Sequence, residues 1–332
     1  MSTPARATWR RLAAVVVLAA SVASAGCGSR EAPPGTEQGD TAALPNYQRP
    51  EHYKVHRTAD LLVPMRDGYR LTCDLYRPGQ EGGAPRAGRF PGIVGDYTGY
   101  GRRLGERTAS WLAARGYNVI VCNTRGAQGG NGASPAPEST GPLFPWQPQE
   151  QEDDYDLIEW LAAQQWSTGK VGQYGGSYGA ITSWLVAGRQ KPPHLAAIVP
   201  MMGARTSTPS SRTPGGIRTN EGDARGQWTQ ACSQATGEPT CSDRMTALWA
   251  AHPVYDRFWE QQTVDLEVYT VPTLAIAGLQ DFFTNGADGA YKELAERDDF
   301  RVLYGPWNHV GVPVNGVAFN PQGIVLAWLA DR

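Results

Sequence analysis

Apolar and polar residues follow two different patterns along the chain. Residues 54–64 and 69–78 alternate apolar with polar side chains on either side of Arg66-Asp67-Gly68, which is typical of a half-buried β-hairpin. Later apolar runs are short and bounded by Gly, Pro or polar turns, a pattern that indicates strands buried on both faces. We expect such strands at 89–97, 117–124, 171–175, 195–202, 273–278 and 301–305.

Helical periodicity occupies the segments between these runs. Helices are expected at 106–115, 149–163, 178–187, 287–297 and 323–330. The alternation predicts an α/β protein with a mostly parallel central sheet flanked by helices. Residues 205–265 break the alternation with turn residues and with Trp228, Trp249 and Trp259. We therefore expect a core formed by 49–204 and 266–332, with 205–265 as an inserted cap.

The N-terminus has the pattern of an export signal. Three arginines precede an apolar stretch at 12–20 and a small-residue run at 21–26. That stretch is shorter than the ~20 residues needed to cross a bilayer. We predict a signal peptide at 1–26, followed by a flexible tether at 27–48 that is rich in Gly, Pro, Glu and Ser.

Two cleavage sites compete in this segment. Ala23-Ser24-Ala25 fits ordinary signal cleavage, whereas Ser24-Ala25-Gly26-Cys27 resembles a lipobox, in which Cys27 becomes lipidated. We favour the lipobox, although Ser24 stands where such signals usually carry an aliphatic residue. An exported, membrane-anchored lipoprotein is expected, with a secreted protein as the alternative, and a lipid at Cys27 would be the protein's one membrane contact.

Export permits disulfides. Cys232 and Cys241 lie nine positions apart in a polar stretch and are the expected pair. Cys73 and Cys122 lie inside apolar strand patterns, and we expect them to be buried, inert thiols. No Cys or His cluster has metal-ligand spacing, so no metal site and no cofactor are predicted.

Composition narrows the class of partner. The chain has 332 residues, 41% of them apolar, and a formal net charge of −2. Such a chain buries a large core and presents no overall basic field, so we expect no nucleic-acid partner. A small-molecule ester or a short peptide is the expected substrate, and the oligomeric state is left open.

The sequence Gly175-Gly176-Ser177-Tyr178-Gly179 matches the G-x-S-x-G nucleophile elbow. In a chain with 39 glycines the motif alone is weak. Its context supports it, because an expected strand precedes Ser177 and an expected helix follows. The elbow holds a serine in a strained turn above the sheet, and small neighbours permit the close packing.

A serine nucleophile needs a base and an acid that orients the base. His309 is the one histidine beyond the candidate acids, directly after the last apolar strand. Asp281 follows the strand expected at 273–278, at the edge where open α/β sheets place functional loops. Asp288 is the rival acid, but we expect it to open the following helix.

Several motifs together resemble the cocaine esterase and Xaa-Pro dipeptidyl-peptidase group of α/β-hydrolases, called CocE/NonD hydrolases. The resemblance covers 63–309 and rests on the elbow and on four further motifs: Met65-Arg66-Asp67-Gly68, Asp74-Leu75-Tyr76-Arg77-Pro78, Thr124-Arg125-Gly126 and Gly305-Pro306-Trp307-Asn308-His309. It implies an α/β-hydrolase fold and a serine hydrolase. It also implies an oxyanion hole formed by the backbone N–H of Tyr178 and the hydroxyl of Tyr100, with Tyr97 as the alternative tyrosine.

The chain departs from this family in two places. Asn123 stands where an aspartate commonly precedes Thr-Arg-Gly. Many relatives continue into a C-terminal β-sandwich domain, which we expect to be absent here because the chain ends at Arg332 soon after the helix expected at 323–330. Either the chain is a minimal member of the family or it is a fragment.

The function that these residues predict is acyl transfer to water from an ester or amide, which requires the neutral imidazole of His309. We favour an esterase over an Xaa-Pro dipeptidyl-peptidase, for which the cap offers unranked carboxylates at Glu221, Asp223 and Asp243. A non-catalytic exported binding protein on the same fold is a further alternative. Trp166, Trp184 and the cap tryptophans are candidates for lining an apolar acyl pocket, although core packing is the commoner fate of tryptophan.

Overall fold

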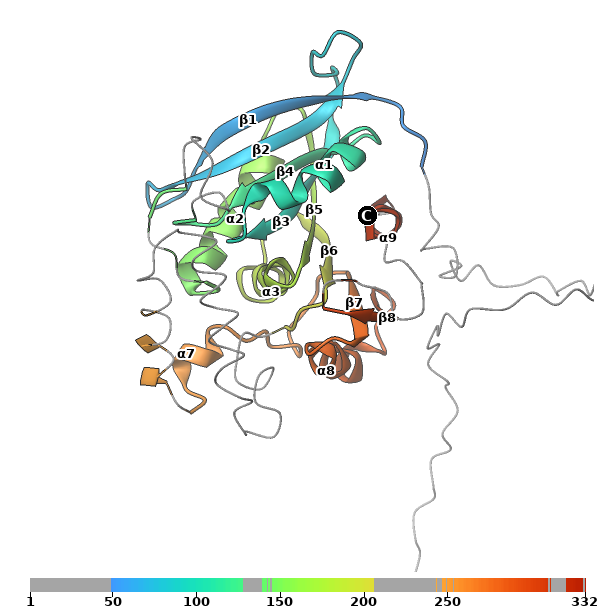
Figure 1. Ribbon diagram of the computed structural model, residues 1–332. Coiled ribbons are helices and arrows are strands. Elements are labelled where there is room, and N and C mark those ends of the chain that lie inside the picture. Colours follow the sequence, from blue (N-terminus) through green and yellow to red (C-terminus); the bar gives the residue numbers. More distant parts are fainter. Residues whose placement is uncertain are drawn as a thin grey trace, which may run out of the picture.

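A twisted eight-stranded sheet forms the centre of the computed structural model (Figure 1). Its strands lie in the order β1-β2-β4-β3-β5-β6-β7-β8. The structure describes residues 49–127, 139–141, 143, 145–205, 243, 247–248, 250–252, 254–309, 311, 321–330 and 332. The signal, the tether, Cys27 and the Cys232–Cys241 pair lie outside the described residues, as does most of the expected cap.

Both hairpin strands lie at one edge of the sheet and run antiparallel to their neighbours. β1 (Lys54–Pro64) pairs with β2 (Arg70–Gly79), and β2 pairs with β4 (Asn118–Asn123). The remaining pairs are parallel and are made by β3 (Phe90–Thr98), β4, β5 (Ser167–Gly176), β6 (Leu195–Met201), β7 (Thr273–Gln280) and β8 (Phe300–Asn308). β3 lies between β4 and β5, so the strands that follow it in the chain are added first on one side of it and then on the other. Such a switch point opens a crevice at the carboxyl ends of the strands.

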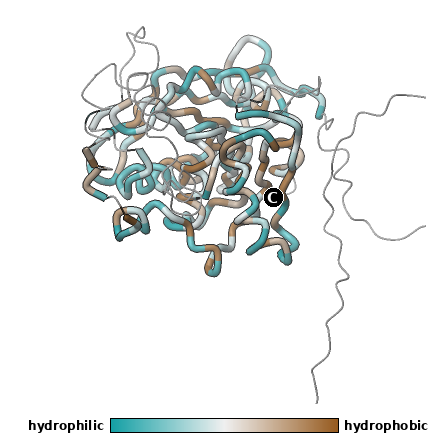
Figure 2. The backbone as a smooth tube through the Cα atoms, turned by 60° about the horizontal axis from the view of Figure 1, so that its bottom comes forward, coloured by the Kyte–Doolittle hydropathy of each residue, from teal (hydrophilic) through white to brown (hydrophobic). Residues whose placement is uncertain are grey.

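Helices cover both faces of the sheet, and each face has its own apolar core. α1 (Glu106–Ala113) and α9 (Pro321–Ala330) pack on one face, and α2 (Pro148–Ala162), α3 (Tyr178–Leu185) and α8 (Thr284–Leu294) on the other. In Figure 2, brown apolar segments run through the middle of the molecule, and teal hydrophilic stretches alternate with some brown ones in the outer loops. None of the described helices is long and apolar enough to cross a membrane. The α/β-hydrolase fold predicted from the sequence is confirmed.

The expected elements are found with shifted ends. β5 begins at Ser167 rather than at residue 171, and a π-helical turn, η3 (Val186–Gln190), extends the helix after the elbow. α8 begins at Thr284, so the expectation that Asp288 opens this helix is wrong. The described end of the expected cap contains α7 (Arg257–Glu260), whose first turn is capped by the side chain of Asp256.

Cys73 and Cys122 form a disulfide, so the expectation of free thiols is wrong. The two residues are register partners on the neighbouring strands β2 and β4, with Cα atoms 4.1 Å apart. Both are completely buried. Each cysteine looks like a core residue of its own strand, and only the pairing of strands distant in sequence brings the two together.

Candidate active site

Ser177 lies in a sharp turn between β5 and α3. Its backbone has φ 52° and ψ −109°, a conformation that is strained for a residue with a side chain. A Cβ on Gly175 would lie 2.5 Å from the backbone of Gly179, and a Cβ on Gly179 would lie 2.8 Å from Asp96. The turn therefore requires glycine at both positions of the motif, and it leaves Ser177 partly exposed at the end of the strand.

Three side chains form one hydrogen-bonded chain at this point. Ser177 Oγ lies 2.8 Å from His309 Nε2, and His309 Nδ1 lies 2.9 Å from Asp281 Oδ1. Because a carboxylate only accepts, Nδ1 carries the proton and Nε2 is left to accept from the serine hydroxyl. Asp281 is almost fully enclosed and its Oδ1 also accepts from the backbone N–H of Phe283. This arrangement prepares the imidazole to take the serine proton.

Sheet register explains why Asp281 and not Asp288 reaches the histidine. Gln280 of β7 pairs with Asn308 of β8, so the next residue of each parallel strand, Asp281 and His309, emerges side by side. Asp288 instead accepts a hydrogen bond from Tyr304 within the α8 layer.

The other four histidines have contacts elsewhere. His56 bonds to Gly83, His194 to Glu159 and His252 to Asp256, while the backbone of His52 bonds to Ala114.

The first turn of α3 offers a donor for an oxyanion. Tyr178 is the first residue of this helix, where backbone N–H groups have no acceptor within the helix. Tyr100, on the loop after β3, lies with its ring centroid 5.6 Å from that of Tyr178 in an edge-on arrangement. The structure thus brings both predicted oxyanion residues to the elbow.

Tyr97, the alternative tyrosine, is enclosed in the core. Its side chain is completely buried, and burial together with the nearby carboxylates of Asp153, Glu150 and Asp154 raises its pKa. An enclosed hydroxyl of this kind has no access to a substrate, so the geometry favours Tyr100.

The loop that carries Tyr100 ends in a fixed turn. The backbone N–H of Arg102 donates to the side chain of the buried Asn123 at 2.7 Å. The Arg102 guanidinium forms ion pairs with Asp60 and Asp74 of the hairpin. Asn123, the first departure from the family, therefore has a structural contact that holds the start of η2 (Arg102–Gly105).

Two of the sequence motifs meet through one arginine. Arg125 makes a two-pronged pair with the buried Asp153, with contacts of 2.8 and 2.5 Å, and also contacts Asp67 at 2.7 Å. Burial opposes the charged form of Arg125, but its hydrogen bonds to Asp153 and Asp67 raise its pKa. Arg125 in turn holds the pKa of Asp67 below its usual range, while burial raises the pKa of Asp153 to about 6. The ion pairs of Arg125 therefore hold the motifs 65–68 and 124–126 to α2, and we call this arrangement a structural clamp.

Sequence reasoning missed a group of buried acids on α2. Glu150 and Asp154 are almost wholly enclosed, and burial raises the pKa of each to about 8. Glu150 accepts from the Tyr178 hydroxyl at 2.6 Å, and Asp154 accepts from Gln173 at 2.9 Å. A helix rich in acids looks solvated in the sequence, and the available signal that this face is buried was that Leu157 and Ile158 lie three and four positions after Asp154.

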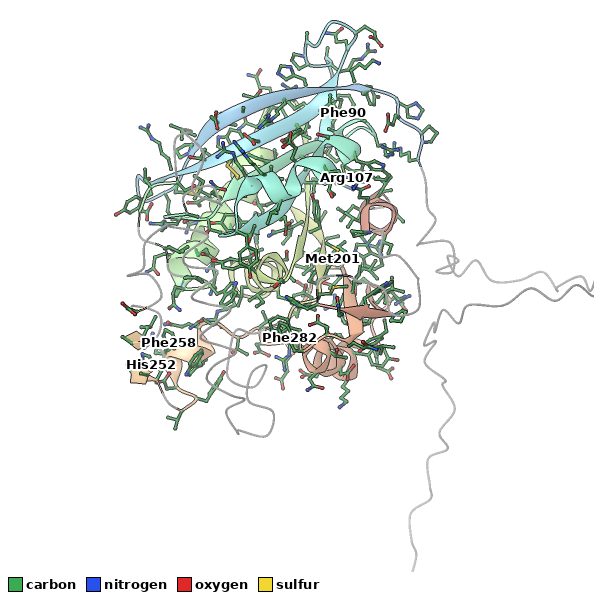
Figure 3. The ribbon with its side chains drawn as sticks, in the orientation of Figure 1. Phe90, Arg107, Met201, His252, Phe258 and Phe282 are labelled. Carbon is green, nitrogen blue, oxygen red and sulfur yellow. A yellow bond between two sulfur atoms is a disulfide. The ribbon has the colours of Figure 1, made fainter. Side chains whose placement is uncertain are left out.

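The expectation that Trp166 and Trp184 line a pocket is wrong. Trp184 is 1% exposed and packs among Tyr269 and Phe300 in the core. Trp166 precedes β5, whereas Ser177 follows it, and the Trp166 carbonyl accepts from the amide of Phe90. Figure 3 shows Phe90 well separated from Phe282, which adjoins Asp281.

The described residues of the expected cap do not supply the pocket residues either. Trp259 is buried, with its indole N–H donating to the carbonyl of His252, so it serves local packing. Trp228 and Trp249 lie outside the described residues, as do Glu221 and Asp223, and Asp243 is exposed.

The aromatic side chains that do lie at the site are two phenylalanines beside His309. Phe282 is 48% exposed, and its ring lies 4.2 Å from that of His309, while the ring of Phe283 lies 5.4 Å away. Within the part of the chain that the structure describes, no three His, Cys, Asp or Glu side chains are grouped so as to hold a metal ion.

Comparisons with known proteins find relatives that are hydrolases. The model of the X-Pro dipeptidyl-peptidase (S15) family matches residues 67–239 and 213–311. Cocaine esterase from Rhodococcus sp. (strain MB1 Bresler) is 26% identical over 76% of this chain and 48% of its own length. A CocE/NonD family hydrolase from Staphylococcus aureus is 27% identical, with a TM-score of 0.62 over 76% of this chain and 46% of the other.

An aminopeptidase from a marine sediment archaeon, Thaumarchaeota archaeon, shares the fold, with a TM-score of 0.53 and 24% identity over 92% of this chain and 58% of that chain. The matched part spans 48% of the length of cocaine esterase and 27% of the length of a putative serine esterase from Mycobacterium bovis.

Proposed function

Because the chain belongs to the X-Pro dipeptidyl-peptidase (S15) family, we propose that it is a serine hydrolase that cleaves a carboxylic ester through an acyl-enzyme. The observation that carries this proposal is the hydrogen-bonded chain from Ser177 through His309 to Asp281. A fold alone does not guarantee chemistry, but three side chains in these roles and within these distances are what acyl transfer requires.

The mechanism follows from the donors and acceptors at the site. His309 removes the proton from Ser177 Oγ, which attacks the ester carbonyl to form a tetrahedral intermediate. The N–H of Tyr178 and the hydroxyl of Tyr100 stabilise the oxyanion, and Asp281 stabilises the imidazolium. The imidazolium then protonates the departing alcohol. Water, deprotonated by His309, releases the acid and regenerates Ser177.

An Xaa-Pro dipeptidyl-peptidase is the second candidate, and the match to that family over residues 67–311 favours it. The relative cocaine esterase and the aromatic rings beside His309 support an ester instead, because Phe282 offers an exposed apolar surface at the reacting group.

The test compares turnover of a short-chain p-nitrophenyl ester and of an Ala-Pro p-nitroanilide by the mature protein and by Ser177→Ala. Ester turnover that requires Ser177 supports the proposal, and anilide turnover supports the second candidate. Activity that survives Ser177→Ala would remove this residue as nucleophile. No turnover together with no labelling of Ser177 by a fluorophosphonate would leave a non-catalytic binding protein.

The chain offers a matched control for the histidine. His252 also has an aspartate partner, Asp256 at 2.6 Å, and a phenylalanine ring, Phe258, at 4.2 Å. In Figure 3, His252 and Phe258 lie together on the α7 side, away from Phe282. His309→Ala should abolish turnover, whereas His252→Ala should leave it intact. Equal losses in the two variants would argue against His309 as the base.

We further propose that the protein is exported and anchored by a lipid at Cys27. The disulfide between Cys73 and Cys122 supports an oxidising compartment. With a second bridge between Cys232 and Cys241, Cys27 would be the unpaired cysteine, as lipidation requires. The intact mass of the protein from its native host tests this: a lipid-modified chain that begins at Cys27 supports it. A chain that retains residues 1–26 contradicts export, and an unmodified chain that begins at Gly26 contradicts the anchor.

A further inference from the structure

The residue that supplies the proposed oxyanion donor is itself held by a buried carboxyl group. The Tyr178 hydroxyl donates to Glu150 Oε2 at 2.6 Å, and both residues are at most 2% exposed. Oε1 of the same carboxyl accepts from the backbone N–H of Trp146 at 3.1 Å. Glu150 therefore joins the side chain of Tyr178 to the chain segment that precedes α2.

Trp146 closes this arrangement from the other side. Its indole N–H donates to the backbone carbonyl of Tyr178 at 3.4 Å, and its ring centroid lies 4.8 Å from that of Tyr178. Its own backbone has φ 61°, and its carbonyl accepts from Gln151 at 2.7 Å. A strained residue that is held from several sides is a typical feature of a site whose geometry must be kept.

The other oxyanion residue depends on the same ring. Tyr100 packs edge-on against Tyr178, so a shift of the Tyr178 ring displaces the support of Tyr100 as well. The Tyr178 hydroxyl is buried, and a buried hydroxyl that loses its partner is strongly disfavoured.

From these contacts we infer that Glu150, acting with Trp146, is a positioning residue that holds Tyr178 so that its backbone N–H points at the developing oxyanion. The inference rests on the proposed function. Glu150 touches neither the substrate nor Ser177, and it acts through Tyr178.

A purely structural reading of Glu150 makes a different prediction. An acid at the third position of a helix often accepts N–H groups before that helix and stabilises its first turn. Loss of that role lowers thermal stability and leaves kcat per folded molecule unchanged. Loss of the positioning role lowers kcat and leaves KM nearly constant, because the hydrogen bond from the Tyr178 N–H to the substrate oxygen is stronger in the transition state than in the ground state.

The experiment compares Glu150→Ala with Asp154→Ala on the ester substrate in the full chain. Asp154 is a matched control, since it lies on the same helix, is equally buried and has its hydrogen bond with Gln173 of β5 rather than with Tyr178. Removal of one oxyanion donor lowers kcat by about 10²- to 10³-fold, so its displacement in Glu150→Ala should lower kcat by about 10- to 100-fold with KM within about threefold. Asp154→Ala should keep kcat within about twofold of the wild type.

Two further measurements separate positioning from folding. Glu150→Gln keeps a carbonyl oxygen that accepts hydrogen bonds and an amide group beside Tyr178, so its kcat should be close to that of the wild type. Tyr178→Phe should lose as much kcat as Glu150→Ala. Phenylboronic acid, which adds to a serine oxygen and places a hydroxyl where the oxyanion develops, should bind Glu150→Ala more weakly by the same factor as kcat falls. If Glu150→Ala does not fold, Tyr178→Phe and Glu150→Gln still give these two comparisons.

Several results would overturn the inference: an unchanged kcat in folded Glu150→Ala or Tyr178→Phe, or an equal loss in Asp154→Ala. Ser177-dependent turnover and fluorophosphonate labelling of the wild type are measured first. Their absence would refute the proposed function itself, whereas their presence with unaffected Glu150 variants would refute the positioning role alone.

Discussion

Removal of the disulfide between Cys73 and Cys122 should lower the stability of the protein substantially. The bridge closes a loop with a sequence separation of 49 residues, and the loss of unfolded-state entropy on closing a loop of this length corresponds to about 4 kcal/mol. Because both residues are completely buried, replacing them with alanine removes packing contacts as well. The melting temperature of Cys73→Ala/Cys122→Ala should therefore fall by about 10 °C relative to the wild type.

Guanidinium unfolding of the wild type and the double variant, both without reductant, measures this difference. The variant retains Cys232 and Cys241, so any bridge between those residues is common to both proteins. The unfolding free energy should depend more steeply on guanidinium concentration in the variant, because an unfolded chain without the cross-link exposes more surface. Equal unfolding free energies, or two alkylated thiols at positions 73 and 122 in the unreduced wild type, would refute the reasoning.

Three further predictions concern the site and the acids beneath it. Tyr100→Phe should lower kcat by about 10²-fold while the melting temperature stays constant, and an unchanged kcat would exclude this hydroxyl from the oxyanion hole. Arg125→Met leaves the buried carboxylate of Asp153 without its partner and should cost about 3–5 kcal/mol in urea unfolding, and a loss below 1 kcal/mol would contradict the clamp. Burial raises the pKa of Asp154 to about 8, so the folded state binds its proton more tightly than the unfolded state does, and the stability from this group is lost as pH rises towards 8. Asp154→Asn should therefore lose less stability between pH 6 and 9 than the wild type, and parallel pH profiles would count against this shift.

The local elements of this protein follow from the sequence because each depends on neighbouring residues. Short apolar runs predict the central strands, since a parallel strand covered on both faces must be apolar throughout. The glycines around Ser177 predict the elbow, because the turn brings Gly175 and Gly179 into backbone contact. His309 follows from its position after the last strand.

Expectations about where a single side chain lies in the folded protein, and how deeply it is buried, were less successful. Trp166 and Trp184 are of a residue type that often lines pockets. Trp166 instead lies at the end of β5 that is far from Ser177, and Trp184 packs in the core. The sequence analysis did not single out Glu150 and Asp154, although the face of α2 that carries them lies against the sheet and the elbow.

The sequence by itself determined the succession of strands and helices along the chain, the elbow, and Ser177 and His309 as its candidate nucleophile and base, because local periodicity and backbone sterics suffice for these features. The sequence favoured Asp281 over Asp288 as the acid, but the tertiary structure decided which residues distant in the chain became partners. The pairing of Gln280 with Asn308 placed Asp281 beside His309, the pairing of β2 with β4 joined Cys73 to Cys122, and the packing of α2 brought Glu150 to Tyr178. Such partnerships depend on strand order and register, which are settled by the burial of the whole core and not by any local segment.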